Sequence, residues 1–322
     1  MAGLERVDVA PLRAAAGHAV VGTSVDRVRE SVGIGRATTA SSFRVASLTK
    51  PLTAVAVLRA TQRAGIGLDA PVLDVLPGLR ADWAADRDLT IAEVLAQTSG
   101  LAPTVSGDDI ARLGDHDGVA LDAARLVVRA GSIRSPGLRW EYYNGNYFLA
   151  GALVATLTGE PFEEAVESLV LRPWGLASTS FAVPPDLTPG DDRGRRVAGT
   201  AYPRGRRPSG GLCSTVEDVL SFGEHLLDEP DLLEPTRTAR TRAGDPMRYG
   251  LGWALGPSGQ LYLNGRLPGY RAALLLVPAA HLVGVVLAAD SASLPAAARI
   301  LSDLQRDHTG DDLTLAIDTF AA

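Results

Sequence analysis

Residues 46–51 read ASLTKP and place a serine and a lysine three positions apart. On a helix, side chains at positions i and i+3 lie on one face, so Ser47 and Lys50 would be neighbours. A serine hydroxyl is a weak nucleophile that needs an adjacent base. A lysine amine that is removed from water can lose its proton and act as that base. The pair therefore predicts attack by the Ser47 oxygen on a carbonyl carbon.

Lys50 is the only lysine in a chain with 31 basic residues, and all the others are arginines. A guanidinium keeps its proton at every attainable pH, so arginine cannot replace lysine where a proton must move. At the start of a helix, the backbone N–H groups would also favour the negative charge that develops on an attacked carbonyl. Taken alone, S-x-x-K is a weak motif, and the alternative is a capping serine followed by an exposed lysine.

The composition excludes several classes of protein. The 322 residues are 46% hydrophobic and 21% charged, which predicts a folded chain of one or two domains rather than a disordered one. A net charge of -6 with dispersed arginines argues against nucleic-acid partners. Cys213 is the single cysteine, which excludes an internal disulfide and a multi-cysteine metal site, and we expect it to pack as a small hydrophobe. The five histidines lack ligand spacing, so no metal or cofactor is expected.

The N-terminal stretch, residues 1–22, contains acidic residues where a signal peptide would have an uninterrupted apolar run. No later segment is apolar for long enough to span a bilayer. We therefore expect a cytoplasmic protein without a membrane partner. The oligomeric state stays open.

Strand-like and helical patterns are distributed unevenly along the chain. Residues 18–34 predict a hairpin of two strands, and residues 46–65 predict a helix that begins near Ser47 and is distorted by Pro51. Short helical runs separated by loops then follow, with a long surface connection at residues 184–210. The last third predicts a helix at 215–227 and a closing helix at 294–307. Between them it predicts four strands, at 249–256, 260–265, 270–278 and 281–290.

Strands at both ends of the chain predict a single sheet completed by the two termini, with a helical block inserted between them. The expected fold class is α/β (α+β), with an antiparallel sheet flanked by helices. We expect the sheet domain to be discontinuous, at 1–69 and 206–322, and the mainly helical domain to span 70–205.

The stretch FRVASLTKPLTA resembles the first motif of the serine β-lactamase and penicillin-binding-protein superfamily. The similar branch is the class C β-lactamase-like one, which includes esterases and D-amino-acid peptidases. Five further segments match that branch in order, at 90–101, 136–151, 171–181, 209–222 and 249–253. The resemblance spans residues 18–290 and implies a β-lactamase/transpeptidase-like fold. It also implies an acyl-enzyme formed on Ser47, with Lys50 as the base.

The stretch WEYYNGNY resembles the family's Y-x-N motif and maps Tyr142 and Asn144 onto the catalytic tyrosine and its partner asparagine. The resemblance implies that Tyr142 relays a proton between lysine, serine and leaving group, because its oxygen both donates and accepts. It implies that Asn144 holds the lysine and a substrate amide. Tyr143 is a possible competitor, although the family spacing selects Tyr142. The alternative is an aromatic packing cluster, and Trp140 and Tyr147 are assigned to the core.

The third family motif departs from its usual form. The family carries K-T-G or H-x-G there, followed by P-G-[FY], whereas LNGRLPGY places Leu263, Asn264 and Gly265 at these positions. The resemblance implies an oxyanion hole made by the backbone N–H groups of Ser47 and Arg266, which needs no particular side chain.

Leu263 puts the binding of a substrate carboxylate in doubt unless Arg266 or Arg271 reaches the site. The alternative is that both arginines point to solvent. Strand alternation puts Arg271 on one face of a strand and leaves Arg266 in a loop.

The sequence therefore predicts a serine hydrolase with Ser47, Lys50, Tyr142 and Asn144 as its catalytic set. An esterase or acyl hydrolase acting on a small-molecule ester or amide is favoured. Three alternatives stay open. The first is a β-lactamase or D-alanyl-D-alanine carboxypeptidase-type activity, with a lactam or peptide substrate. The second is an acyltransferase in a biosynthetic pathway, and the third is a non-catalytic binding module.

Overall fold

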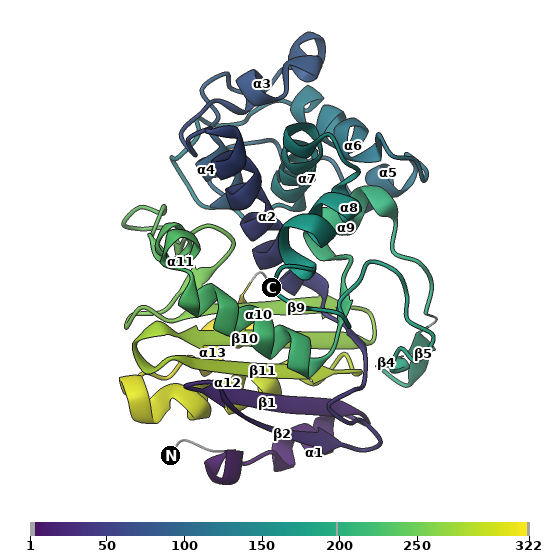
Figure 1. The fold of residues 1–322 in the computed structure, drawn as a ribbon, viewed down its shortest axis with the longest axis vertical. Helices are drawn as coiled ribbons and strands as arrows, with labels where there is room; N and C mark the ends of the chain where they lie inside the picture. Colours follow the sequence, from purple (N-terminus) through teal and green to yellow (C-terminus); the bar gives the residue numbers. More distant parts are fainter. Residues whose placement is uncertain (1–3, 198, 321–322) are drawn as a thin grey trace.

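The computed structural model describes residues 4–197 and 199–320. Figure 1 shows a sheet with helices packed along it and a block of helices beyond one edge of the sheet. The main sheet has seven antiparallel strands in the order β2-β1-β11-β10-β9-β8-β7. Its strands are β1 (Ala19–Val25), β2 (Val28–Ile34), β7 (Arg248–Tyr249), β8 (Ala254–Leu255), β9 (Leu261–Leu267), β10 (Tyr270–Val277) and β11 (Leu282–Ala288).

The central strands are apolar on both faces. Every residue of β11 is buried, and so are seven of the eight in β10. Antiparallel strands usually alternate polar and apolar residues, and a continuous apolar run requires cover on both faces. That cover comes from α10 (Val216–Asp228) and α12 (Leu294–Thr309), both of which pack on the sheet. The smaller helices next to the sheet are α1 (Ala10–Ala15), α11 (Pro230–Arg237) and α13 (Thr314–Thr319).

The helical block is built around α7 (Asn144–Thr158), which packs against α2 (Thr49–Ala64) and α6 (Val119–Arg129). The other α-helices in this part are α3 (Val72–Val75), α4 (Ile91–Leu95), α5 (Gly107–Ala111), α8 (Phe162–Val166) and α9 (Arg207–Gly210). Two short ladders pair β3 (Phe43–Arg44) with β6 (Cys213–Ser214), and β4 (Gly190–Asp192) with β5 (Arg195–Val197). The remaining turns of helix are η1 (Leu4–Arg6), η2 (Ala46–Leu48), η3 (Pro77–Asp82), η4 (Glu167–Leu171), η5 (Arg204–Arg206) and η6 (Pro278–Ala280).

The predicted architecture is confirmed: the antiparallel sheet is assembled from both ends of the chain and flanked by helices. The expected hairpin is β1–β2, and its turn residues Asp26 and Arg27 have φ of 49° and 65°, as a two-residue hairpin turn requires. The division into domains at residues 69 and 206 stays a proposal. Helix α2 falls in the sheet segment of that division, yet it packs against α7 of the helical block.

Three local predictions were wrong. The connection at 184–210 was expected to be loop and contains the β4–β5 hairpin. The closing helix was expected to be the last element, whereas α13 follows it. Arg266 was expected in a loop and lies in β9, because the β9–β10 hairpin pairs as far as Leu267 and Tyr270.

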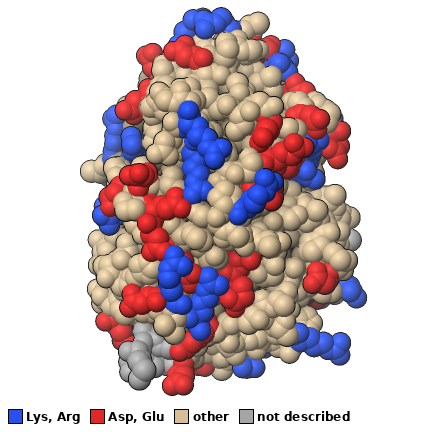
Figure 2. Space-filling view, viewed as in Figure 1, with Lys and Arg blue, Asp and Glu red and all other residues tan. Residues whose placement is uncertain are grey.

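The surface carries charges of both signs. Figure 2 shows basic and acidic side chains interspersed over the face in view, without a broad area of one sign. No helix in the described part of the chain is both long enough and apolar enough to cross a membrane.

Candidate active site

Ser47 lies in η2, where the chain leaves β3 and turns into α2. The preceding residue, Ala46, has φ of 50°, which is a strained backbone conformation for a residue with a Cβ. Neighbouring groups hold this turn: the Val45 N–H donates to the Leu212 carbonyl at 3.1 Å, and the Thr49 hydroxyl donates to the Ala46 carbonyl at 2.8 Å. The turn leaves the Ser47 side chain half-buried at the start of the helix.

Lys50 lies one helical turn further and is completely buried. Its Nζ is 3.2 Å from Ser47 Oγ and donates to the Ser209 carbonyl oxygen at 2.7 Å. It also lies over the rings of Tyr142 and Tyr147, 4.9 and 5.4 Å from their centroids. Loss of water around the amine lowers the pKa of Lys50 to about 7. A large fraction of the amine is therefore neutral near pH 7 and able to accept a proton.

Tyr142 comes from the segment just before α7 and reaches Ser47 from the helical block. Its hydroxyl is 2.8 Å from Ser47 Oγ, so Lys50, Ser47 and Tyr142 form one continuous hydrogen-bonded chain. Desolvation raises the pKa of Tyr142 well above its ordinary value, which keeps the phenol protonated at neutral pH. Of the two groups next to Ser47, the lysine is the one whose pKa suits a base near neutral pH, and the tyrosine keeps its proton there. Their catalytic roles stay a prediction.

Gln97 fixes the position of Tyr142 from both sides. It is buried, with φ of 61°, and its carbonyl oxygen accepts from the Glu141 N–H at 2.9 Å. Its side-chain Oε1 accepts from the Tyr143 N–H at 3.0 Å and from Asn146 Nδ2 at 2.6 Å. Sequence reasoning matched the segment that contains Gln97 but gave this residue no role. Its only signal was its place in that matched segment, because the partners lie more than forty positions away.

The sequence predicted that Asn144 would contact Lys50, and the structure does not bring these two residues together. Asn144 is the exposed first residue of α7, and its side chain makes no hydrogen bond to the described residues. The predicted contact of Asn144 with a substrate amide stays a prediction. Tyr143 does not compete with Tyr142, since its hydroxyl donates to the Val105 carbonyl at 3.4 Å.

The aromatic residues assigned to the core are indeed buried: Trp140 is 8% exposed and Tyr147 is 0% exposed. Tyr147 also forms part of the wall around the Lys50 amine, as its ring lies beneath Nζ. The alternative of a simple packing cluster therefore holds for these two residues. It does not hold for Tyr142, whose hydroxyl bonds to Ser47.

Strand β9 runs past the backbone of Ser47 and packs closely against it at Gly265. A Cβ at this position would lie 2.4 Å from the Val45 carbonyl oxygen and 3.2 Å from the Ser47 nitrogen. Only glycine therefore lets the strand come this near. The approach brings the strand that carries Arg266 next to the Ser47 nitrogen, and the oxyanion hole itself stays a prediction. Leu263, two residues earlier in β9, is fully buried.

The polar side chains of β9 are bonded to other parts of the chain. Asn264 Nδ2 donates to the Ile317 carbonyl, and an Arg266 N–H donates to the Asp318 carbonyl. Arg271, in β10, donates to the carbonyls of Leu267 and Tyr270 at 2.8 Å each. The two arginines were expected either to point to solvent or to reach the site. Both are instead bonded to main-chain carbonyls.

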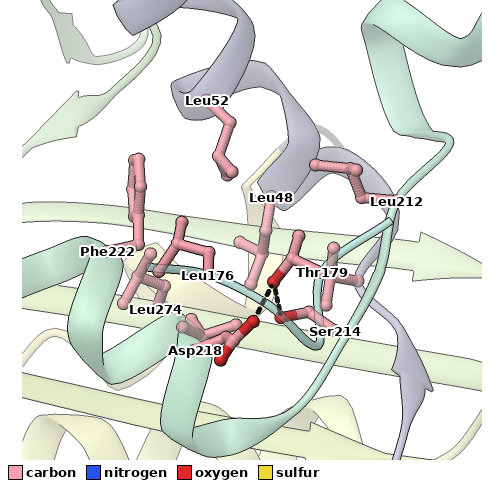
Figure 3. Close-up of a pocket in the computed structure, with 11 residues that line it drawn as sticks. Leu48, Leu52, Leu176, Thr179, Leu212, Ser214, Asp218, Phe222 and Leu274 are labelled. Atoms are coloured by element: carbon pink, nitrogen blue, oxygen red, sulfur yellow. Dashed lines mark hydrogen bonds between the residues drawn. The ribbon is translucent and has the colours of Figure 1, made fainter. Parts of the chain in front are cut away.

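A separate small cavity lies behind the first turns of α2 (Figure 3). It measures about 10 Å³, room for no more than about one water, and it is lined by leucines and Phe222. Thr179 donates to Asp218 at 2.8 Å at its polar edge. Neither Ser47 nor Tyr142 lines this cavity, so it is not the substrate site. Cys213 is buried in β6, as the sequence predicted.

The sheet, the helical block and the serine at the start of α2 define the class as β-lactamase-like proteins, a family of serine hydrolases. The chain belongs to the Beta-lactamase family, whose family model matches residues 8–305. The family predicted from the six sequence segments is confirmed.

The curated relatives include an enzyme named for ester hydrolysis. The chain is 32% identical over 256 residues to Esterase EstB of Burkholderia gladioli, a match that covers 66% of the chain. The chain spans 65% of EstB's length.

The solved structures that share the fold include a β-lactamase and an amidohydrolase. A class C β-lactamase from Rhodobacter sphaeroides has a TM-score of 0.75 at 20% identity, covering 91% of this chain and 95% of that one. A D-stereospecific amidohydrolase from Streptomyces sp. has a TM-score of 0.73 at 21% identity, covering 94% and 99%.

Proposed function

We propose that the protein is a serine acyl hydrolase that forms an acyl-enzyme on Ser47 and acts on small esters or amides. The observation that carries this proposal is the buried Lys50 amine, 3.2 Å from Ser47 Oγ and with a pKa lowered to about 7. A residue kept only for charge would be exposed or paired with a carboxylate, and Lys50 has no ion pair within the described ranges. The similarity to EstB supports an ester as the substrate.

In the first step, neutral Lys50 accepts the Ser47 proton as Oγ forms a bond to the substrate carbonyl carbon. The carbonyl electrons move to oxygen, which the backbone N–H groups of Ser47 and Arg266 stabilise. The electrons then return and the bond to the leaving group breaks. Tyr142 donates its hydroxyl proton to the leaving oxygen or nitrogen and recovers a proton from the Lys50 ammonium. The products are an alcohol or amine and an ester on Ser47.

Water completes the cycle by the reverse route. It loses a proton to the Lys50–Tyr142 pair while its oxygen attacks the acyl carbon, and Ser47 leaves as a hydroxyl when that proton returns to Oγ. The acid is released, and serine, lysine and tyrosine regain their starting protonation states. An alcohol or amine acceptor in place of water would make the same acyl-enzyme an acyltransferase.

The test is intact-mass spectrometry after exposure to a fluorophosphonate, to p-nitrophenyl acetate and to a chromogenic cephalosporin. Ser47→Ala is compared with Ser178→Ala, which changes an exposed serine elsewhere. We expect an adduct on the wild type and on Ser178→Ala and none on Ser47→Ala. An adduct retained by Ser47→Ala would overturn the proposal. Faster turnover of the cephalosporin than of the ester would overturn the preference for esters. The cytoplasmic location expected from the sequence stays a prediction.

A further inference from the structure

The last described residues of the chain lie next to the candidate active site. Helix α13 (Thr314–Thr319) and Phe320 follow α12, outside the residues that the family model matches. Helix α13 contacts β9, and the ring of Phe320 contacts that of Tyr142. The segment 314–320, called here the C-terminal wall, thus lies outside the matched residues and beside β9, the strand that passes Ser47.

The C-terminal wall is held by the strand that carries the third family motif. Asn264 Nδ2 donates to the Ile317 carbonyl, and an Arg266 guanidinium N–H donates to the Asp318 carbonyl. Ile317 is fully buried. The Asn264 amide nitrogen and one guanidinium nitrogen of Arg266 are therefore held by main-chain oxygens of the protein itself.

Phe320, at the end of the C-terminal wall, packs against Tyr142. The ring of Phe320 is 1% exposed and meets the Tyr142 ring edge-on, with the centroids 5.6 Å apart. It stacks on Tyr249 at 6.1 Å and lies 6.3 Å from Trp140 and 6.5 Å from Tyr262. The Tyr142 hydroxyl is 2.8 Å from Ser47 Oγ. Phe320 is consequently separated from the nucleophile by a single ring.

We propose that the C-terminal wall determines specificity for the leaving group. The proposal rests on the acyl-enzyme function above, in which Tyr142 gives a proton to the leaving atom and so has the leaving group beside it. Phe320 then limits the size of that group. The engagement of Asn264 Nδ2 and of one Arg266 nitrogen by the wall ties these two side chains to the protein and so weakens the binding of a carboxylate on the leaving group. The preferred substrates are esters of small, uncharged alcohols.

Three variants test this proposal. Phe320→Ala opens space beside Tyr142, and deletion of residues 311–322 also frees Asn264 and Arg266. Leu315→Ala is the matched control, because Leu315 is on the same helix but is 73% exposed. Each is assayed with acetyl esters that differ only in the alcohol: methyl acetate, 2-naphthyl acetate and O-acetyl-lactate. Fluorophosphonate labelling of Ser47 is measured in parallel.

For Phe320→Ala we expect the kcat/KM ratio of 2-naphthyl acetate to methyl acetate to rise by about 10-fold or more, the scale of one changed pocket contact. The deletion should additionally raise the relative kcat/KM of O-acetyl-lactate. Leu315→Ala should change neither ratio. Phe320→Ala preserves the main-chain contacts of the wall and keeps the size test available if the deletion variant fails to fold.

Normal labelling with an unchanged naphthyl-to-methyl ratio in Phe320→Ala would overturn this inference alone. An equal rise for all three esters in the deletion variant would also overturn it, because the segment would then be a general cover. A wild type that the fluorophosphonate does not label would remove the basis of both proposals.

Discussion

Lys50 Nζ donates to the Ser209 carbonyl oxygen at 2.7 Å, and that neutral acceptor positions the amine without adding a negative charge beside it. A carboxylate within about 4 Å would favour the ammonium form and raise the pKa of the lysine. A carbonyl fixes the direction of the amine while burial lowers the pKa to about 7. The position of the Lys50 amine is thus set by the Ser209 carbonyl of α9, and its basicity is set by burial.

Replacement of Lys50 should strongly reduce turnover. Lys50→Arg keeps a positive charge, but a guanidinium does not lose its proton and cannot act as a base. We therefore expect kcat/KM for p-nitrophenyl acetate to fall by about 10³-fold, within the usual contribution of general base catalysis. Arg63→Ala, at the exposed end of α2, is the control and should retain full activity. Unchanged turnover in Lys50→Arg would show that another group removes the Ser47 proton.

The activity should depend on pH through Lys50. Since the neutral amine is the base, kcat/KM should rise with pH through about 7 and level off above it. A stopped-flow or pH-stat profile from pH 5 to 9 measures this. A flat profile over that range would contradict the assignment of Lys50 as the base.

The same titration should appear in the stability of the fold. The unfolded lysine has a pKa near 10.5 and the folded one near 7, so the unfolded chain binds more protons between these values. The free energy of unfolding should therefore rise with pH across this window. Urea unfolding of the wild type and of Lys50→Met checks it. The variant, which has no amine at this position, should lose this component of the rise, and equal slopes in both proteins would refute the prediction.

Gln97 should act as a positioning residue for Tyr142. Gln97→Ala removes the acceptor for the Tyr143 N–H and for Asn146, so we expect kcat to fall by about 10-fold or more with little change in KM. Gln97→Glu keeps an acceptor oxygen in the same place and should recover most of the loss. Failure of Gln97→Glu to recover activity while it remains folded would point to a purely structural role.

Gly265→Ala should separate β9 from Ser47. The added Cβ would lie 2.4 Å from the Val45 carbonyl oxygen, 3.0 Å from the Ala46 Cβ and 3.2 Å from the Ser47 nitrogen, and none of these atoms can move away by rotation of a side chain. We expect a loss of about 1–3 kcal/mol in the free energy of unfolding, together with a loss of activity. Gly67→Ala is the control, since a Cβ there has no atom within 4 Å. Thermal unfolding and ester turnover of both variants decide the outcome.

Local sequence patterns anticipated the parts of the molecule that depend on short-range spacing. Ser47 and Lys50 meet because they are three residues apart on a helical turn, and the apolar runs of β10 and β11 become the buried strands. Tyr142 was reached only through the resemblance to a family, because its contact with Ser47 joins residues 95 positions apart.

Features that depend on tertiary packing were missed. Gln97 looks like any polar residue at the end of a short helix until the fold places Tyr143 and Asn146 against it. Helix α13 has six residues, three of them threonine or isoleucine with low helix propensity, and it is held in place by contacts with α12 and β9 rather than by its own preference. Asn144 had the expected spacing, but the first turn of α7 directs it outward.

Because the only lysine of the chain is buried, chemical modification of Lys50 can measure how often the protein opens locally. Every cationic side chain at the surface is a guanidinium, so an acylating or reductive-alkylation reagent finds no lysine on the outside of the folded molecule. Modification of Lys50 can proceed only as often as the surrounding shell opens, and its rate against that of a denatured sample gives the frequency of that opening.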